Sequence, residues 1–283
     1  MTTRRIRNAR MFVAAAVIGL AGCQNDTSIF GPLNRSIARG HIKRGDRLRD
    51  NGDFDSASAA YRRAVARDER NADAHARLAA VQCQIGNHES AAEHYAAAVR
   101  YDPENSVYAR ALADALYRAS GTAIKRFEIL RAAARAYCHA STLDPDSLPI
   151  ALGLARSYRQ LGELDQAIDV LESARRIDPS ASLIHLELGA IHDDRFDYKR
   201  ALAEFNTAVR LDPDDPVAHF HCGAVNLTLA DLDAGNPIYR QRAAAHLRRS
   251  IEIDPHQPLV QDMLRVSAPP QLRAVTAAAH TDE

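Results

Sequence analysis

An Asp-Pro pair recurs at five regularly spaced places in this chain of 283 residues, and its period restricts the possible folds more than any other feature. The pairs begin at residues 102, 144, 178, 212 and 254, so successive pairs lie 42, 34, 34 and 42 residues apart. A period of this length is typical of repeat proteins, in which each unit packs mainly against its neighbours. We therefore predict one continuous array with a long exposed surface.

The Asp-Pro pairs divide residues 38–257 into six units, and small and bulky residues recur at fixed places within them. The units are residues 38–71, 72–105, 106–147, 148–181, 182–215 and 216–257. Two columns of small residues enclose one bulky column: Ala57, Ala91, Ala133, Ala167, Ala201 and Ala243, then Tyr61, Tyr95, Tyr137, Leu171, Phe205 and Leu247, then Ala64, Ala98, Ala140, Ala174, Ala208 and Ser250. Because positions i, i+4 and i+7 share one face of a helix, each unit predicts a helix with a closely packed face.

An earlier helix and a turn are also expected in each unit. Small residues mark the earlier helix at Gly45, Ala79, Ala113, Ala155, Gly189 and Gly223. Gly52, Gly86 and Gly162 follow it, at a position where positive φ would strain other residues. Each proline then ends the second helix, because the residue before a proline is driven out of the α region. Each unit therefore predicts a helical hairpin.

These columns resemble the tetratricopeptide repeat over residues 38–257. The resemblance implies an all-α fold, a right-handed superhelical solenoid of six helical hairpins. A C-terminal capping helix is expected at 258–266, followed by a flexible tail at 267–283. Units three and six each carry eight extra residues. We expect them to lengthen the second helix of unit three by about two turns of 3.6 residues and to form a loop before Pro237 in unit six.

The N-terminus resembles the leader of a bacterial lipoprotein. Four arginines precede an apolar stretch that is short for a membrane span, and the stretch ends in Leu20-Ala21-Gly22-Cys23. This lipobox-like sequence implies a signal peptide at 1–22, lipidation of Cys23 and a tether at 23–37. Gln24 after the cysteine favours the periplasmic face of the outer membrane, by resemblance to enterobacterial lipoproteins.

The sequence gives little support for an enzyme or a nucleic-acid-binding protein. Basic and acidic residues number 36 each, without a basic run beyond the first ten residues. No glycine-rich phosphate loop, zinc-protease helix or nucleophile elbow is present. We therefore predict no catalytic residue, cofactor, metal, nucleic acid or small-molecule substrate. Three sets of residues have structural interpretations. We interpret His192, Asp193, Asp194 and Asp197 as a solvated cluster, and His41, His75, His185 and His219 as packing residues. We interpret Cys83, Cys138 and Cys222 as buried free thiols.

The family resemblance implies a binding groove lined by the first helices. The groove candidates are Arg110, Asp114, Tyr117, Arg118, Leu152, Arg156, Arg159, Leu183, Leu186, Phe220 and Leu227. Arginines beside apolar residues suit an extended or helical peptide with acidic and hydrophobic character. The lysine and asparagine clamp of the family's chaperone adaptors is absent from the matching positions.

Together these features predict a lipid-anchored scaffold that binds other cell-envelope proteins. Pilus or secretion assembly, outer-membrane biogenesis and regulation of peptidoglycan enzymes are all compatible with it. Two alternatives remain open at this point. One is a metal- or pH-responsive sensor or enzyme that uses the histidines. The other is a structural envelope protein that associates with itself.

Overall fold

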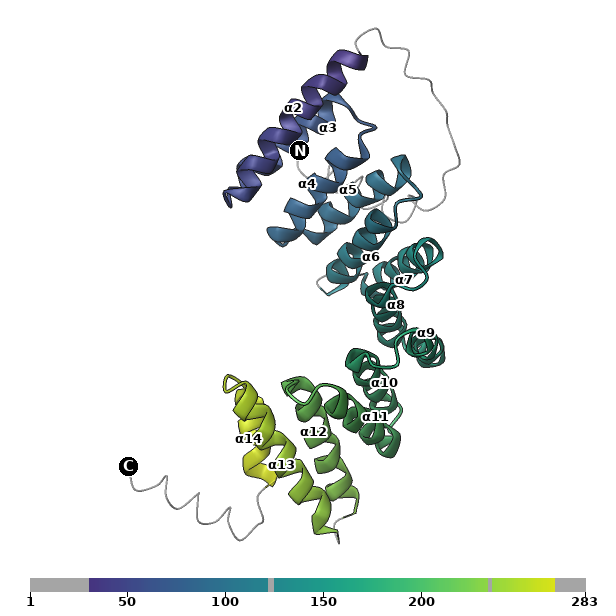
Figure 1. Cartoon of the computed structure of the whole chain (residues 1–283), viewed down its shortest axis with the longest axis vertical. Coiled ribbons are helices and arrows are strands. Elements are labelled where there is room, and N and C mark those ends of the chain that lie inside the picture. Colours follow the sequence, from purple (N-terminus) through teal and green to yellow (C-terminus); the bar gives the residue numbers. More distant parts are fainter. Residues whose placement is uncertain (1–30, 122–124, 234–235, 268–283) are drawn as a thin grey trace, which may run out of the picture. The chain divides into compact units, whose positions relative to one another are not determined.

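The structure is a computed structural model that describes residues 31–121, 125–233 and 236–267. The predicted signal peptide, Cys23 and the tail beyond residue 267 lie outside these ranges. The described residues form thirteen helices and no strand (Figure 1). None of these helices is both long enough and apolar enough to cross a membrane. The chain divides into two compact units, residues 1–162 and 163–283.

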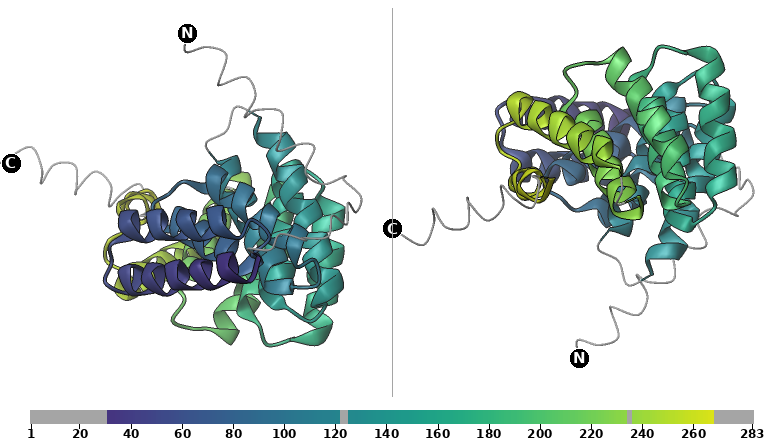
Figure 2. Two further views of the ribbon diagram at one scale, coloured as in Figure 1. Left: turned by 90° about the horizontal axis from the view of Figure 1, so that it is seen from above. Right: turned by 90° about the horizontal axis from the view of Figure 1, so that it is seen from below.

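The helices of the first unit follow one another as hairpins. They are α2 (Gly31–Asp50), α3 (Phe54–Arg67), α4 (Ala72–Gln84), α5 (His88–Tyr101), α6 (Ser106–Ser120), α7 (Arg126–Leu143) and α8 (Leu148–Leu161). Each packs against the next, and α6 also lies against α8. Figure 2 shows α2 and α3 side by side at the N-terminal end of this unit.

The second unit repeats the arrangement. It holds α9 (Leu164–Ile177), α10 (Ser182–Asp194), α11 (Tyr198–Leu211), α12 (Pro216–Leu232), α13 (Pro237–Ile253) and α14 (Pro258–Ser267). The last helix, α14, packs against α13 and α12 and buries Val260 there. This helix covers apolar surface that the last hairpin would otherwise expose.

The Asp-Pro pairs end the second helices in the way the sequence predicts. An aspartate is the C-cap of each second helix, with φ between −128° and −143°: Asp68, Asp102, Asp144, Asp178, Asp212 and Asp254. The amide of each donates to the carbonyl four residues earlier, in the second small column. Asp68, which lacks a following proline, leaves the helical conformation in the same way, so the repeat ends this helix even without a proline.

The core is made from the small and bulky columns. All six alanines of the first column are fully buried, as are Tyr61, Leu171, Phe205 and Leu247 of the bulky column. The small residue of each first helix lets the bulky residue of the second helix approach closely. A Cβ added to Gly45 would lie 2.5 Å from Cε1 of Tyr61, and one added to Gly189 would lie 2.6 Å from Cδ1 of Phe205. Since contacts between nonbonded carbons lie near 3.5–4.0 Å, each glycine makes room for its partner.

The hairpin turns use left-handed backbone. Gly52, Gly86 and Gly162 have φ of +80°, +79° and +79°. In the fifth hairpin, Phe196 takes the matching place and keeps a φ of +61°. The sequence predicts a turn between the two helices of this unit, but no glycine marks the residue with left-handed backbone.

Three boundaries differ from those expected. Residues 31–37, assigned to the tether, belong to α2, where Leu33 and Ile37 extend the apolar spacing that continues to Ala38. The second helix of unit three, α7, has 18 residues, against 14 in α5, so it gains about one turn instead of two. In unit six both helices have 17 residues, and Pro237 begins α13 as predicted.

Candidate protein-binding surface

The first-helix surface of the first unit is rich in arginine. Arg110 and Arg118 lie on α6, and Arg156 and Arg159 lie on α8, the helix packed against it. Arg118 and Arg156 are exposed, and Arg110 and Arg159 are half-buried. Four cations on two neighbouring helices give this surface a positive character.

Asp114 is the predicted acidic member of this surface, and it is tied to the core. The Tyr137 hydroxyl, in the same hairpin, donates a hydrogen bond of 2.5 Å to Oδ1 of Asp114. Burial raises the pKa of Tyr137, and the hydrogen bond to Asp114 raises it further, while the charge of Arg156 acts in the opposite direction. Asp114 therefore has a structural role as well as a place among the arginines.

Tyr117 is half-buried and packs against the core between the second and third hairpins. Its hydroxyl accepts a hydrogen bond of 2.5 Å from Nε2 of Gln160 on α8. Gln160 also accepts a 3.0 Å hydrogen bond from Nη2 of Arg126 at the start of α7. These contacts join α6, α7 and α8 beside the arginines.

The apolar candidates separate into exposed and buried residues. Leu183, on α10, is 45% exposed, whereas Phe220 and Leu227, on α12, are half-buried. Leu152 and Leu186, in contrast, are buried, and Leu186 belongs to the core between the last two hairpins. These two predicted groove residues therefore contribute mainly packing, with little accessible surface.

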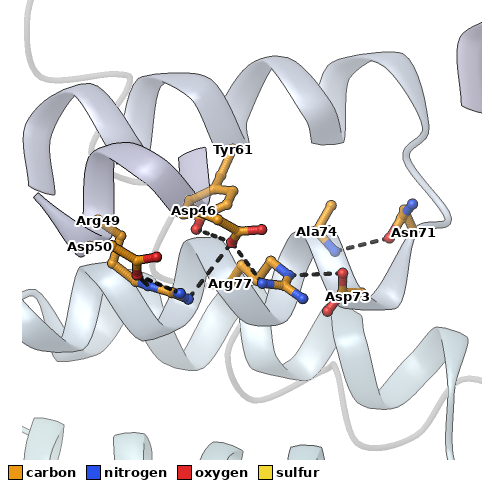
Figure 3. A network of polar contacts seen from close by, with 8 residues as sticks. All are labelled: Asp46, Arg49, Asp50, Tyr61, Asn71, Asp73, Ala74 and Arg77. Carbon is orange, nitrogen blue, oxygen red and sulfur yellow. Dashed lines mark hydrogen bonds and ion pairs between the residues drawn. The ribbon is translucent and has the colours of Figure 1, made fainter. Parts of the chain in front are cut away.

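An arrangement like that of Asp114 and Tyr137 occurs in the first hairpin. The Tyr61 hydroxyl donates a 2.7 Å hydrogen bond to Oδ1 of Asp46, and Nη1 of Arg77 donates a 2.6 Å bond to the same oxygen (Figure 3). Arg77 also binds Asp73 through Nε at 2.8 Å. Burial and the Asp46 hydrogen bond raise the pKa of Tyr61 to about 12. The network joins α2, α3 and α4.

Three of the four histidines assigned to packing, His75, His185 and His219, have polar side-chain partners that the sequence did not reveal. Nδ1 of His75 lies 3.2 Å from Nδ1 of His94, and Nδ1 of His219 lies 3.1 Å from Nδ1 of His246. Nδ1 of His185 lies 2.7 Å from Oε2 of Glu204 in the corresponding place. The prediction that these histidines pack in the interior is correct for the three, but it missed their polar partners. The sequence feature that could have revealed these contacts is the spacing between each histidine and its partner. The spacing is 19 residues in two hairpins and 27 in the last, which contains the eight-residue insertion.

The tautomer of the His75 pair follows from its second contact. Nε2 of His75 lies 3.1 Å from the carbonyl oxygen of Glu69, and that oxygen can only accept. Nε2 therefore carries the proton in neutral His75, so its Nδ1 accepts from Nδ1–H of His94. Nε2 of His219 likewise lies 3.1 Å from the carbonyl oxygen of Pro213. The same orientation thus recurs in the last hairpin.

Burial favours the neutral form of these rings. It lowers the pKa of His94 to about 4, with further lowering by the charges of His75 and Arg62. Burial also lowers the pKa of His75, where Arg100 acts in the same direction and Glu69 opposes it. The pKa of His246 is lowered by burial and then by His219 and Arg242. Protonation would place positive charge where it is poorly solvated.

The acidic cluster around His192 lies where α10 turns into α11. His192, Asp193 and Asp194 end α10, and Asp197 caps α11 by accepting a 3.2 Å bond from the Arg200 amide. Among the described residues, no three His, Cys, Asp or Glu side chains are placed to hold one metal ion. A histidine pair alone has fewer protein ligands than the three of a typical catalytic zinc site.

The three cysteines of the described chain are free thiols. Cys222 is buried, and burial raises its pKa to about 12, whereas Cys83 and Cys138 are half-buried. Since the thiolate is the nucleophile, a raised pKa makes Cys222 unreactive. His221, two residues from His219, stacks on Phe205 with ring centroids 4.8 Å apart, so the two histidines have different surroundings.

A pocket of about 420 Å³ lies at the start of α2. Arg35, Arg67 and Arg70 line it together with Asp68 and Glu69. These opposite charges give the pocket no preference for an anion or a cation, and we assign no ligand to it.

The family model that describes the tetratricopeptide repeat matches residues 42–106, 121–182 and 152–216, more than half of the chain. The chain belongs to the tetratricopeptide repeat family. The all-α fold class predicted from the sequence is therefore confirmed. Members of this family are in general scaffolds for protein–protein interaction, and this fold provides such a scaffold. None of the curated proteins compared with this tetratricopeptide repeat chain matches it in sequence.

Solved structures of other tetratricopeptide repeat proteins are similar to this chain. A crystal structure of MamA protein is 23% identical, with a TM-score of 0.56, over 62% of this chain and 92% of MamA. Pseudomonas aeruginosa pilF is 21% identical, with a TM-score of 0.56, over 81% of this chain and 97% of pilF. YrrB, described as a TPR protein with an unusual peptide-binding site, is 19% identical, with a TM-score of 0.54, over 63% of this chain and 88% of YrrB. At these identities the likeness establishes the fold alone.

Proposed function

We propose that this protein is a lipid-anchored adaptor of the bacterial cell envelope, which binds acidic segments of other envelope proteins through its first helices. The observation that carries the binding part is the set of four arginines on α6 and α8, Arg110, Arg118, Arg156 and Arg159. Asp114, the carboxylate of the predicted groove set, accepts a hydrogen bond from Tyr137. Arginine binds carboxylates through two parallel hydrogen bonds, which suits an acidic peptide.

The relatives and the N-terminal sequence support the rest of the proposal. YrrB carries a peptide-binding site by its description, and pilF covers most of this chain. The sequence Leu20-Ala21-Gly22-Cys23 supports acylation of Cys23 and hence attachment to a membrane. We propose that the protein lies at the periplasmic face of the outer membrane, because Gln24 follows the cysteine as in enterobacterial lipoproteins of that membrane.

Crosslinking in native membranes tests the binding part. The variant Arg156→Glu/Arg159→Glu reverses two charges on α8, and we expect it to lose the crosslinked partners of the wild type. The control Arg131→Glu/Arg135→Glu reverses two exposed charges on α7, a second helix of the same unit. Equal capture by all three proteins would disprove the proposed surface. Circular dichroism confirms that each variant is folded.

Anchoring is tested separately. The mass of the mature protein should show acyl chains on Cys23, and Cys23→Ser should allow about 1 M salt to extract the protein from membranes, whereas the acylated protein should stay bound. An unmodified Cys23 would contradict the anchor while leaving the binding surface to the crosslinking test.

A second candidate is a protein whose stability responds to acid. The His75–His94 and His219–His246 pairs support it, because burial lowers the pKa of His75, His94 and His246 and so disfavours their charged forms. This response is compatible with an adaptor role, and pH-dependent unfolding tests it.

A further inference from the structure

The exposed side of α2 carries a row of positive charge. Arg35, Arg39, Lys43 and Arg47 follow one another at intervals of four residues, which place them along the helix over about 18 Å. Arg44 lies close by on the same helix. All five side chains are exposed. We call this set the α2 basic face.

The carboxylates of α2 itself do not neutralise the α2 basic face. The two carboxylates of α2 are engaged elsewhere: Asp46 binds Tyr61 and Arg77, and Asp50 binds Arg49. Within residues 31–121, 125–233 and 236–267, no member of the face forms an ion pair. Arg39 donates a weak 3.4 Å bond to the Arg35 carbonyl, which leaves both charges in place.

The other terminal helix shows that one sign of charge is not required at the end of a repeat array. An end repeat needs a polar outer face to stay in solution. In α14 residues of both charges meet this need, and Asp262 and Arg265 form an ion pair of 3.0 Å. The single sign on α2 therefore calls for a further reason.

The position of α2 in the sequence supplies that reason. Gly31, at its start, lies eight residues after Cys23, so an extended chain between them reaches at most about 29 Å. A membrane anchor at Cys23 would hold α2 close to the headgroups. Basic segments next to a membrane anchor are attracted to anionic lipids, and the attraction decays over a Debye length of about 10 Å.

We propose that the α2 basic face docks on anionic phospholipid headgroups. This inference rests on the proposed membrane attachment, because acyl chains at Cys23 would bring the face to the surface. The hairpin then has two attachments, one by acyl chains and one by charge. Dual signals of this kind give more stable attachment than one lipid chain alone.

Vesicle binding tests the α2 basic face without the acyl chains. A chain that begins at Gln24 lacks Cys23 and keeps every residue that the structure describes. We expect it to co-sediment with vesicles of phosphatidylcholine mixed with phosphatidylglycerol. It should not co-sediment with vesicles made only of phosphatidylcholine. Raising the ionic strength from about 0.1 M to about 1 M shortens the Debye length to about 3 Å and should release the protein.

Paired substitutions locate the contact. Each cation near an anionic membrane contributes about a fivefold change in binding, so Arg39→Gln/Lys43→Gln should lower the partition coefficient about 25-fold. The control Arg242→Gln/Arg248→Gln removes the same charge from two exposed arginines of α13 and should bind as the wild type does. An equal loss in both variants would assign the binding to net charge and overturn the proposal.

Two other results would also overturn it. Either equal binding to both kinds of vesicle or binding to neither would exclude recognition of anionic headgroups by α2. Tighter binding to an acidic peptide or to duplex DNA than to the mixed vesicles would identify a different partner. Acylation of Cys23, measured by mass on the full chain, decides the anchor independently of these results.

Discussion

The imidazoles of His75 and His94 face each other across one helical hairpin, with their Nδ1 atoms 3.2 Å apart. His94 donates and His75 accepts, so the contact is lost when Nδ1 of His75 takes up a proton. The last hairpin repeats the contact between His219 and His246 at 3.1 Å. The pairs link the pH of the solution to the packing of two hairpins.

We predict that the protein loses stability as the pH falls from about 6.5 to about 4. Histidine in the unfolded chain has a pKa near 6.5, and the folded pKa of His94 is about 4. Below pH 6.5 the unfolded state binds more protons, so the free energy of unfolding decreases until His94 is also protonated in the folded state. For the His75–His94 pair we expect a loss of roughly 1–2 kcal/mol, less than the full shift in the pKa of His94 implies, because His94 is partly exposed.

Urea unfolding followed by circular dichroism across this pH range measures the effect. The double variant His75→Phe/His94→Phe removes one pair and should flatten the dependence, whereas His256→Gln, at an exposed site, should not. A pH dependence that is the same in all three proteins would rule out the pair as its source.

Two glycines of α2 should respond to alanine in opposite ways. A Cβ on Gly45 would lie 2.5 Å from Cε1 of Tyr61, which is fully buried and bound to Asp46. Overpacking of this kind costs about 1–3 kcal/mol, so Gly45→Ala should destabilise the first hairpin. Gly40 has open space around it, and Gly40→Ala should stabilise α2 by about 0.5–1 kcal/mol through helix propensity. The urea midpoints of the two variants measure these changes in stability. Equal effects of Gly45→Ala and Gly40→Ala would contradict the close approach of Gly45 and Tyr61.

The sequence predicted the hairpins well because their determinants lie within one unit. The alanine at Ala57 and the tyrosine at Tyr61 recur with the period of the repeat, and the structure buries both fully. The ends of the second helices were also predictable, because Asp102 and its counterparts take extended backbone at the residue before proline.

The parts that the sequence missed depend on contacts between helices. The pairing of His75 with His94 joins two helices, and single-column patterns do not report such a contact. Leu186 was assigned to the groove by its position in the repeat, yet it packs in the core with Phe205. The tether was placed up to residue 37 because the columns begin at 38, while α2 continues the helix back to Gly31. Position within a repeat therefore predicts a helix face better than it predicts exposure.

Asp114 should prove to be structural, in contrast to its neighbour Arg118. Tyr137 is buried, and Asp114→Ala would leave its hydroxyl without the 2.5 Å hydrogen bond. A buried polar group without a partner costs about 1–3 kcal/mol, so the free energy of unfolding should fall by that amount. Arg118→Ala, at an exposed position, should change it by less than about 0.5 kcal/mol. Thermal unfolding distinguishes the two, and an unchanged Asp114→Ala would return this carboxylate to the binding surface.

Phe196 should be a site where glycine stabilises the protein. Its φ of +61° is the backbone conformation that Gly52, Gly86 and Gly162 adopt in the other turns, and its side chain is 76% exposed. A left-handed conformation costs a non-glycine residue about 1–2 kcal/mol, and glycine's greater freedom in the unfolded chain returns part of this. We therefore expect Phe196→Gly to stabilise the second unit by about 0.5–1 kcal/mol. The matched change Gly162→Ala should cost about 1 kcal/mol, because it places a Cβ on the same left-handed backbone. Both are measured as shifts of the urea midpoint. A destabilised Phe196→Gly would mean that the exposed ring contributes packing, for which its contact with Tyr198, at a centroid distance of 6.3 Å, is the available source.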